Sequence, residues 1–583
     1  MSSTPFARLA HLGEQLERTS GRQALAALLA DFLQDLSPDE VPPAVRLIIG
    51  QVFPEWDARA LNVSWQAVMA VIDGLTGAPP AVREEVAAQA VDGGEAVRLL
   101  LERARRGPPS PPPLMLLEVF RTCEEIAETA GKGSRARKEA LLKGLFARAT
   151  PVEAKYLAKV IYQEMRHGVS EGLLLDGIAR AARLKPRLVQ RANQMWGDVG
   201  EVARVALTAG EAGLRQAAPR PFRPLKPMLA QAAESLAEPF ERYGGRLALE
   251  YKLDGARVQI HRRGAEVRIY SRHLADVTGS LPDVAAEVRN KLAAQEAILE
   301  GEAVAVDAQG RPLPFQHLMR RFRRKHAVAA TVEEVPIRLY LFDLLYVDGK
   351  SLVDAPCQER WTALEQAAGE LMLVRRLLPQ TVEEGEAFAE VASRDGHEGV
   401  MAKHLDSAYT PGVRGKAWLK LKHVISLDLV VVAAEWGYGR RHGWLSNYHL
   451  AARDEETGEY QVVGKTFKGL TDAGFQAMTE RLLRLEHSRQ GARSSCGRRS
   501  WSRCCSTRSR PAPSTARGWH CVSPASSACA RTKRRSRPTR SRPCANSTSG
   551  SSSTRGGRGE RKGHIRSGDS GQPRQGQGMA LGT

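Results

Sequence analysis

The sequence predicts a multidomain protein in which an all-α region is followed by an α+β region, a smaller β unit and a basic tail. Apolar residues recur at three- and four-residue steps from about residue 5 to 205, alternate with polar residues from Leu247 onward, and become scarce after Ser488. The first two patterns are typical of helices and strands, and the scarcity of apolar residues is typical of a disordered chain. With 583 residues the chain is long enough for several cores. We place the domains at residues 1–215, 216–425, 426–487 and 488–583.

The first region is predicted to be helical throughout, as in the run Ala24–Leu33. A proline-rich stretch at 107–113 interrupts the pattern, and we interpret it as a loop between helices because proline cannot continue a helix. A second such stretch, at 218–227, has the composition of a linker and ends the region.

The second region begins with period-two alternation at Leu247, Leu249 and Tyr251, and Asp254–Gly255 is a candidate turn. Helical segments such as 360–371 lie between the predicted strands, so the region is α+β. A continuous apolar strand at 429–434 begins a smaller β unit, which ends in a helix at 474–485.

The basic charge of the chain is concentrated in its tail. Residues 488–583 hold 21 of the 85 lysines and arginines but 2 of the 65 acidic residues, and six of the eight cysteines. The first 487 residues are therefore nearly neutral, so that nucleic-acid binding there would depend on local basic patches. With only Cys123 and Cys357 in this part, and no apolar run long enough for a membrane span, we expect a cytoplasmic protein with no membrane partner.

Two interpretations of the tail are open. Its Ser, Arg, Gly and Pro content is typical of a disordered basic extension. We favour a frameshift, real or from sequencing, between about Glu486 and Gly491. Read from the third base of suitably chosen codons, residues 491–510 can encode a plausible β-rich segment, and aliphatic codons shifted in this way yield the Ser, Cys and Trp seen here.

A series of short motifs follows the linker. Lys252-Leu-Asp-Gly255 alone is a weak signal, because a lysine at a turn is usually only solvated. Five further elements follow it in order, and the series of six is a strong signal. The other five are Ser271-Arg272, Glu300-Gly-Glu302, Phe342-Asp343, Glu398-Gly-Val-Met-Ala-Lys403 and the run Arg414–Lys422.

This series resembles the motifs of the covalent nucleotidyltransferases, which include ATP-dependent DNA ligases, RNA ligases and mRNA capping enzymes. In addition, the segment 153–179 resembles the helical DNA-binding domain of the archaeal-type, three-domain DNA ligases, and 435–450 resembles the opening of their oligonucleotide-binding barrel. The resemblance covers about residues 1–487. It implies a DNA-binding domain at 1–215, an adenylation (nucleotidyltransferase) domain at 216–425 and a partial β-barrel (OB-fold) at 426–487.

The resemblance implies that Lys252 is the catalytic nucleophile, which attacks the α-phosphate of ATP. A lysine must be uncharged to attack, and burial or neighbouring cations favour that form. The other implied roles belong to nucleotide and metal binding. They are base recognition by Glu250, stacking on adenine by Phe342, ribose or phosphate contacts by Arg257 and Arg414, neutralisation of polyphosphate charge by Arg272, Lys420 and Lys422, and Mg²⁺ binding by Glu302 and Glu398, with Glu302 also near the ribose.

The family's reaction implies the cofactors ATP and Mg²⁺ and, as partner, double-stranded DNA with a nick. We expect a monomer associated with the nucleoid; whether a sliding clamp takes part is left open. Sealing needs no sequence reading, so contacts should go mainly to phosphates. Candidate phosphate contacts are the run Arg320–Lys325 and, in the helical region, Arg135, Arg137 and Lys138.

One family element is missing from the sequence as written. The last basic motif of the barrel, of the type Arg-x-Asp-Lys, engages the departing pyrophosphate, and we expect a chain without it to adenylylate poorly or not at all. The offset reading of 518–549 contains such a run. The alternatives to a DNA ligase are an RNA ligase or capping-type enzyme, disfavoured by the helical region, and an inactive nucleic-acid-binding ligase remnant.

Overall fold

The computed structural model describes residues 4–104, 112–322, 332, 334–422, 427–437, 439–485, 488–490 and 500–502. The chain divides into two compact units, residues 1–422 and 423–583. The first unit contains the predicted helical and α+β regions, and the second contains the smaller β unit. Most of the predicted tail, and most of the proline-rich loop 107–113, lie outside the described residues.

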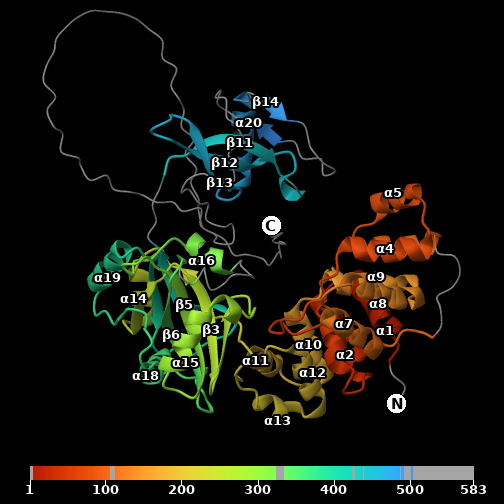
Figure 1. The fold of residues 1–583 in the computed structure, drawn as a ribbon, viewed down its shortest axis with the longest axis horizontal. Helices are drawn as coiled ribbons and strands as arrows, with labels where there is room; N and C mark the ends of the chain where they lie inside the picture. The colour runs from red at the N-terminus through yellow and green to blue at the C-terminus, as the bar shows by residue number, and fades with distance from the viewer. Residues whose placement is uncertain are drawn as a thin grey trace, which may run out of the picture. The chain divides into compact units, whose positions relative to one another are not determined.

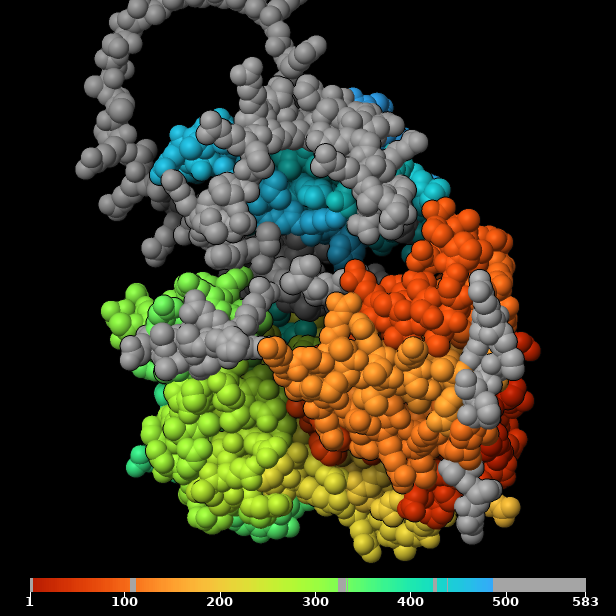
Figure 2. Space-filling model, turned by 45° about the vertical axis from the view of Figure 1, so that its right-hand side comes forward, coloured from red at the N-terminus to blue at the C-terminus, as the bar shows by residue number. Residues whose placement is uncertain are grey.

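The first region is helical, as predicted (Figure 1). Some of its helices begin at side-chain caps: at the start of α9 the Thr150 side chain accepts a hydrogen bond from the Glu153 amide, and the Glu153 carboxylate accepts one from the Thr150 amide. On the face drawn in Figure 2, the helical residues form a closely packed surface. The helices are α1 (Phe6–Arg18), α2 (Arg22–Gln34), α3 (Val41–Ile48), α4 (Trp65–Thr76), α5 (Pro80–Gln89), α6 (Gly93–Ala104), α7 (Leu116–Glu128), α8 (Ser134–Arg148), α9 (Pro151–Tyr162), α10 (Glu171–Ala181), α11 (Pro186–Trp196), α12 (Val199–Thr208) and α13 (Gly210–Arg215).

Two five-stranded sheets follow the linker. The first has the order β1-β10-β9-β2-β8 and the second β4-β3-β5-β6-β7. The strands of the first are β1 (Leu229–Ala232), β2 (Leu247–Lys252), β8 (Arg376–Leu377), β9 (Gly399–His404) and β10 (Arg414–Lys422); those of the second are β3 (Ala256–Arg263), β4 (Glu266–Ser271), β5 (Glu296–Ala305), β6 (Ile337–Val347) and β7 (Lys350–Ser351).

Each sheet is covered by helices on one face. Helices α14 (Ala237–Tyr243) and α19 (Val382–Arg394) pack on the face of the first sheet that carries Leu249. Helices α15 (Pro282–Lys291) and α18 (Cys357–Ala367) pack on the face of the second sheet that carries Val258 and Ile260. The short helices η1 (Thr278–Ser280) and α16 (Phe315–Phe322) complete this part. Because strand side chains alternate, the residues between these core positions point to the opposite faces.

The second unit holds a further sheet of order β13-β12-β11-β15-β14, with helix α20 packed on it. Among the described residues the pairing runs from β13 to β14 and does not close into a barrel. Two of its strands, β14 and β15, lie beyond the boundary predicted at residue 488. The elements are β11 (Val430–Trp436), η2 (Gly439–Arg441), β12 (Leu445–Arg453), β13 (Tyr460–Thr466), α20 (Asp472–Arg484), β14 (Ser488–Gln490) and β15 (Ser500–Ser502).

Candidate active site

The strand register brings the predicted site residues of the first sheet to one face. Glu250 of β2 is opposite Met401 of β9, which is opposite Lys420 of β10. At the next position on this face, Lys252 is opposite Gly399, and Gly399 is opposite Lys422. Directly opposed residues point to the same side of a sheet. Glu250, Lys252, Lys420 and Lys422 therefore share the face that α14 and α19 leave free.

The second sheet contributes the carboxylate of Glu302, and a tight turn brings it close to the end of β2. Glu302 of β5 is opposite Arg257 of β3, on the face away from α15 and α18. The turn that connects β2 to β3 passes close to β5: a Cβ added at Gly255 would lie 2.4 Å from the backbone oxygen of Ala303. Only glycine permits this approach, and it is what brings the end of β2 next to Glu302.

The proposed nucleophile is held by a carboxylate. The Nζ of Lys252 donates to Oε2 of Glu398, and Lys422 Nζ lies 3.0 Å from the same oxygen. The backbone is fixed as well, because the Glu398 amide donates to the Lys252 carbonyl at 3.0 Å. Burial raises the pKa of Glu398, but Lys252 and Lys422 outweigh it and the net shift is downward. Glu398 is therefore an anion beside an amine that remains 20% exposed.

Several cations near Lys252 have no carboxylate partner among the described residues. Desolvation lowers the pKa of Lys420, and so does the charge of Lys422, Lys252, Arg414 and Arg272. Desolvation, Arg257 and Arg414 likewise lower the pKa of Arg272. Within the described residues Lys420, Arg272 and Arg414 have no carboxylate at ion-pair distance. Such a group of unpaired, mutually repelling cations would be stabilised by a polyanion.

Two carboxyl groups at the site titrate far above their usual range. Burial raises the pKa of Glu302 to about 7, although Lys252 and Arg257 oppose the shift. Burial and the charge of Glu398 raise the pKa of Asp254 to about 6. No three His, Cys, Asp or Glu residues in the described part of the chain are grouped so as to hold a metal ion by themselves. A cation between Glu302 and Glu398 would thus need oxygen ligands from another molecule.

Glu250 is buried on the same face of the sheet. Its Oε2 lies 2.6 Å from Lys403 Nζ, whereas its buried Oε1 lies 3.9 Å from Arg376 Nε and accepts no hydrogen bond from the described residues. Lys403 also donates to the Phe342 carbonyl at 3.0 Å, and its ammonium lies 4.8 Å from the centre of the Phe342 ring. An unsatisfied buried acceptor beside an aromatic ring fits the amino group and the face of a purine base.

Arg257 uses most of its hydrogen-bond donors within the protein. A guanidinium has five N–H donors. Here Nε donates to Glu300 at 2.5 Å, Nη1 to the Met228 carbonyl at 2.6 Å and Nη2 to the Tyr409 hydroxyl at 3.2 Å. Two donors remain for a nucleotide.

The structure corrects part of the predicted DNA-contact set. Arg321 is fully buried and is bonded to Asp283 at 2.5 Å, because its side chain turns into the core beside α15. It is therefore structural, whereas Arg320 is exposed and residues 323–325 lie outside the described part.

The second predicted contact cluster is bonded within the helical region. Arg135 pairs with Glu139, Arg137 donates to two backbone carbonyls, and Lys138 donates to the Leu61 carbonyl at 2.6 Å. Lys138 in particular is held against the protein.

Sequence reasoning missed several residues of the site. Asp254 was interpreted only as a turn residue, and Lys403 was quoted within a motif without a role. The role of Asp254 could have been suspected from its position two residues after the nucleophile. Tyr409 carried no signal, since it lies between the motifs and reaches Arg257 only through the fold.

Comparison with known proteins agrees with this geometry. Residues 5–179 match the family described as DNA ligase N terminus, and residues 227–422 match the ATP dependent DNA ligase domain. A protein of Korarchaeum cryptofilum named DNA ligase 1 is 47% identical over 486 residues, which is 83% of this chain and 87% of that protein. The chain belongs to the ATP-dependent DNA ligase family.

Further relatives of this ligase support the assignment. The DNA ligase of Thermococcus fumicolans is 42% identical over 82% of this chain and 86% of its own length, and that of Methanopyrus kandleri is 43% identical over the same shares. The predicted family, the helical N-terminal region and the nucleotidyltransferase region are thereby confirmed. No helix in the described part of the ligase has the length and apolar character needed to cross a membrane.

Proposed function

We propose that this chain seals nicks in double-stranded DNA through a covalent bond between Lys252 and AMP. The observation that carries the proposal is the cluster of cations around Lys420, in which Lys252 lies together with Lys422, Arg272 and Arg414. ATP supplies the triphosphate that such a group of cations would bind. Membership of the ATP-dependent DNA ligase family supports the same reaction.

ATP would lie on the shared face, with its base toward Glu250 and Phe342. Oε1 of Glu250, which accepts no hydrogen bond from the described residues, would accept one from the amino group of adenine, while guanine would present a carbonyl oxygen there. The remaining donors of Arg257 and the carboxylate of Glu302 would contact the ribose. The triphosphate would then extend over Lys252 toward Lys420, Lys422, Arg272 and Arg414.

The carboxylates fit a divalent cation shared with the phosphates. Glu302 resists ionisation when buried without a cation, as its raised pKa shows. Mg²⁺ is commonly bound by one or two carboxylates together with phosphate oxygens, and Glu302 and Glu398 would hold it here. When bound, it would neutralise the charge that develops on the phosphates.

In the first step Lys252 loses a proton to solvent, because only the neutral amine can attack, and Glu398 orients this amine through their hydrogen bond. The neutral amine attacks the α-phosphorus, a P–N bond forms, the bond to the departing pyrophosphate breaks, and the nitrogen releases a second proton to solvent. Lys420, Arg272 and Arg414 stabilise the leaving group because they are fixed before the charge develops. AMP then passes to the 5′-phosphate at the nick, and the 3′-hydroxyl displaces AMP as it forms the phosphodiester bond.

We further propose that the protein is a monomer and that its residues 1–215 bind DNA through the phosphates. The second unit would be the beginning of an OB-fold. Its described strands and α20 support that assignment, and β14 and β15 extend the sheet past the predicted boundary. We keep the frameshift proposal for residues 491–583, which predicts a barrel completed by the offset reading. Sequencing the gene across the codons for Glu486–Gly491 tests it.

Incubation with ATP tests the function. The chain and a frame-restored version are incubated with ATP or GTP and Mg²⁺, and the mass of the intact protein is measured. We expect an added AMP on Lys252 with ATP only, to a greater extent in the restored chain, and then sealing of nicked DNA in preference to nicked RNA. If the chain as written binds nicked DNA but never carries AMP, while the restored chain does, the inactive-remnant alternative replaces this proposal for the chain as written.

A further inference from the structure

The linker between the helical and adenylation regions contacts both of them, with residues spaced by three. Arg220, Arg223 and Lys226 contact the helical region, whereas Phe222, Leu225 and Met228 are bonded to buried polar side chains of the adenylation region. Three residues of the linker are thus bonded to each region.

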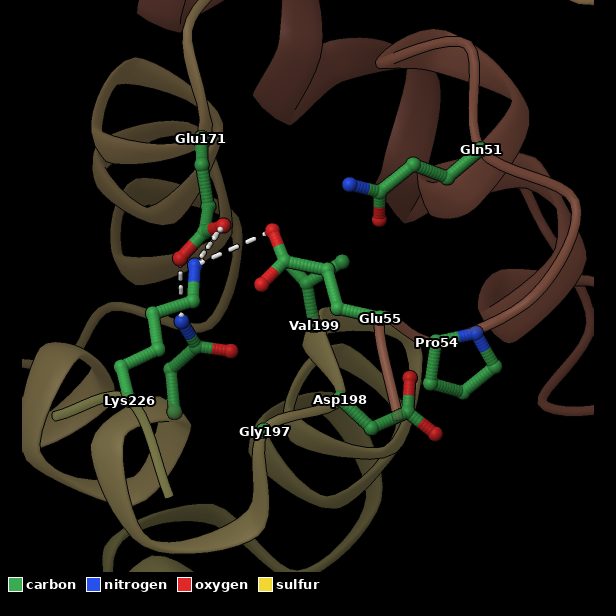
Figure 3. A pocket seen from close by; sticks show the side chains of 9 residues that line it. Gln51, Pro54, Glu55, Glu171, Gly197, Asp198, Val199 and Lys226 are labelled. Carbon is green, nitrogen blue, oxygen red and sulfur yellow. Dashed lines mark hydrogen bonds and ion pairs between the residues drawn. The ribbon is translucent and has the colours of Figure 1, made fainter. Parts of the chain in front are cut away.

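On the helical side the linker is held by ion pairs. Lys226 Nζ lies 2.8 Å from Glu171 and 3.3 Å from Glu55, at the edge of a small polar pocket (Figure 3). Glu171 is itself fixed by Asn193, whose amide donates to it at 2.7 Å. Arg220 and Arg223 both pair with Glu201.

On the adenylation side the linker backbone is bonded to a fully satisfied amide. Gln259 Oε1 accepts from the Leu225 amide at 2.8 Å, and its Nε2 donates to the Leu225 carbonyl at 3.2 Å. The other positions of the same amide are used by His261 Nε2, at 2.9 Å, and by Glu300 Oε1, at 2.7 Å. An amide with all four positions bonded has a single orientation.

His261 fixes the direction of the chain of hydrogen bonds. Its Nδ1 accepts from the Phe222 amide at 2.8 Å, so that Nε2 carries the proton given to Gln259. Burial lowers the pKa of His261 to about 3, which keeps the ring neutral at physiological pH. Phe222 itself has a φ of 69°, which turns its amide toward this ring.

The network ends at Arg257. Glu300 is 1% exposed; its Oε2 accepts from Arg257, and its Oε1 accepts from Gln259 and from the Tyr409 hydroxyl, the latter at 2.9 Å. The Tyr409 hydroxyl in turn accepts from the Met228 amide at 2.9 Å and from Arg257. The linker carbonyl of Met228 completes the cage. Among the described residues this guanidinium thus donates to the linker carbonyl of Met228, to Tyr409, which is bonded to the linker, and to Glu300, which is bonded to Tyr409 and Gln259.

We propose that the linker residues 222–228 and the buried side chains of Gln259, Glu300 and Tyr409 form a positioning network that sets Arg257 for the nucleotide. The network rests on the proposed function, in which the two remaining donors of Arg257 contact ATP. Its members do not touch ATP; they determine where Arg257 lies. The affinity of the adenylation region for nucleotide consequently depends on how the linker is seated.

The test measures binding of α,β-methylene ATP, whose α-phosphate cannot be transferred to Lys252, by calorimetry on the full chain. We expect Tyr409→Phe and Gln259→Leu each to raise Kd about tenfold, because each leaves buried polar partners of Arg257 or the linker unsatisfied. Tyr346→Phe is the matched control: it removes a hydroxyl bonded to Glu296 at 3.0 Å in the same sheet but outside the network, and should change Kd less than about twofold.

A second arm separates positioning from folding. Misfolding lowers the stoichiometry of binding, whereas misplacement of Arg257 raises Kd at unchanged stoichiometry. In an Arg257→Lys background, Tyr409→Phe should cause no further loss, since the two changes act through one group. Unchanged Kd in both single variants, or an equal loss in the two backgrounds, overturns the network. Failure of the unaltered chain to bind the analogue would instead count against the proposed function.

Discussion

Two groups of lysines in this ligase have opposite electrostatic surroundings. In the helical region, Lys155 and Lys159 are 6% and 3% exposed, and carboxylates enclose both. Lys155 lies 2.5 Å from Glu14 and 2.6 Å from Glu17; Lys159 lies 2.7 Å from Glu17 and 3.0 Å from Asp92. At the active site, Lys252 and Lys422 share Glu398, and Lys420 has no carboxylate partner among the described residues.

The difference shows that burial of a lysine does not by itself indicate catalysis. The helical group is deeper, and each of its two cations is paired with two carboxylates, which stabilises the fold and leaves no cation for a ligand. The site group is more exposed and has a surplus of positive charge, which a polyphosphate would neutralise. Charge imbalance, rather than depth, distinguishes the functional group from the structural one.

The largest expected effect belongs to Lys252. Replacement by Ala should abolish the protein–AMP adduct, because it removes the amine that forms the P–N bond, and the melting temperature should stay within a few degrees of the native value. Intact mass after incubation with ATP measures the adduct. The charge-preserving variant Lys252→Arg should also carry none; retained strand sealing in either variant would overturn the assignment.

Replacing a lysine of the helical group should lower the stability of the protein and leave adduct formation unchanged. Lys159→Met leaves Asp92 without its buried cation and Glu17 with Lys155 alone, and should lower the free energy of unfolding by about 3–5 kcal/mol. Denaturant unfolding measures the loss, and the adduct formed per folded molecule should be unchanged. The control Lys143→Met replaces an exposed lysine of α8 and should change stability by about 0.5 kcal/mol or less.

Replacing Lys420 tests whether a cation without a carboxylate partner contributes to formation of the AMP adduct. Lys420→Met should slow adduct formation by about 10²-fold, because one fixed cation is lost where the pyrophosphate charge develops. Stability should hold or rise slightly, since the repulsion from Lys422 and Lys252 is relieved. Lys416→Met, which replaces an exposed lysine on the same strand, is the control; an equal slowing in both variants would contradict a specific role.

The smallest effect is the pH dependence at Glu302. Its folded pKa is about 7, above the unfolded value of 4.5, so the folded state loses stability as pH rises toward 7. Glu302→Gln removes that cost and should therefore raise stability by about 1–3 kcal/mol at pH 8, with little change at pH 4. Thermal unfolding across this range measures it. Exposed Glu359 provides the control as Glu359→Gln, and a loss of stability at pH 8 in Glu302→Gln would show the burial cost to be absent.

The family and the helical and nucleotidyltransferase regions could be predicted from the sequence, because short motifs occur there in a fixed order. The same motifs pick out the candidate site residues on β2, β3, β5, β6 and β10, whose roles stay predictions. Partners that are distant in the chain were not predictable. Arg321 resembles its basic neighbours in sequence, and only its contact with Asp283 shows it to be structural. Gln259 and Tyr409 lie far apart in the chain and meet at Glu300 through the sheet packing alone.

The alternation along β2 places two demands on the same six residues. Leu249 and Tyr251 fill the core beneath α19, while Glu250 and Lys252 lie on the opposite face, where we propose that the nucleotide binds. Adding or deleting one residue within this strand would exchange the two sets, directing the amine into hydrocarbon and the apolar side chains toward phosphate. The length of β2 is thus constrained by solvent exclusion and by chemistry at once, and changes in chain length should be tolerated only in the connections between strands.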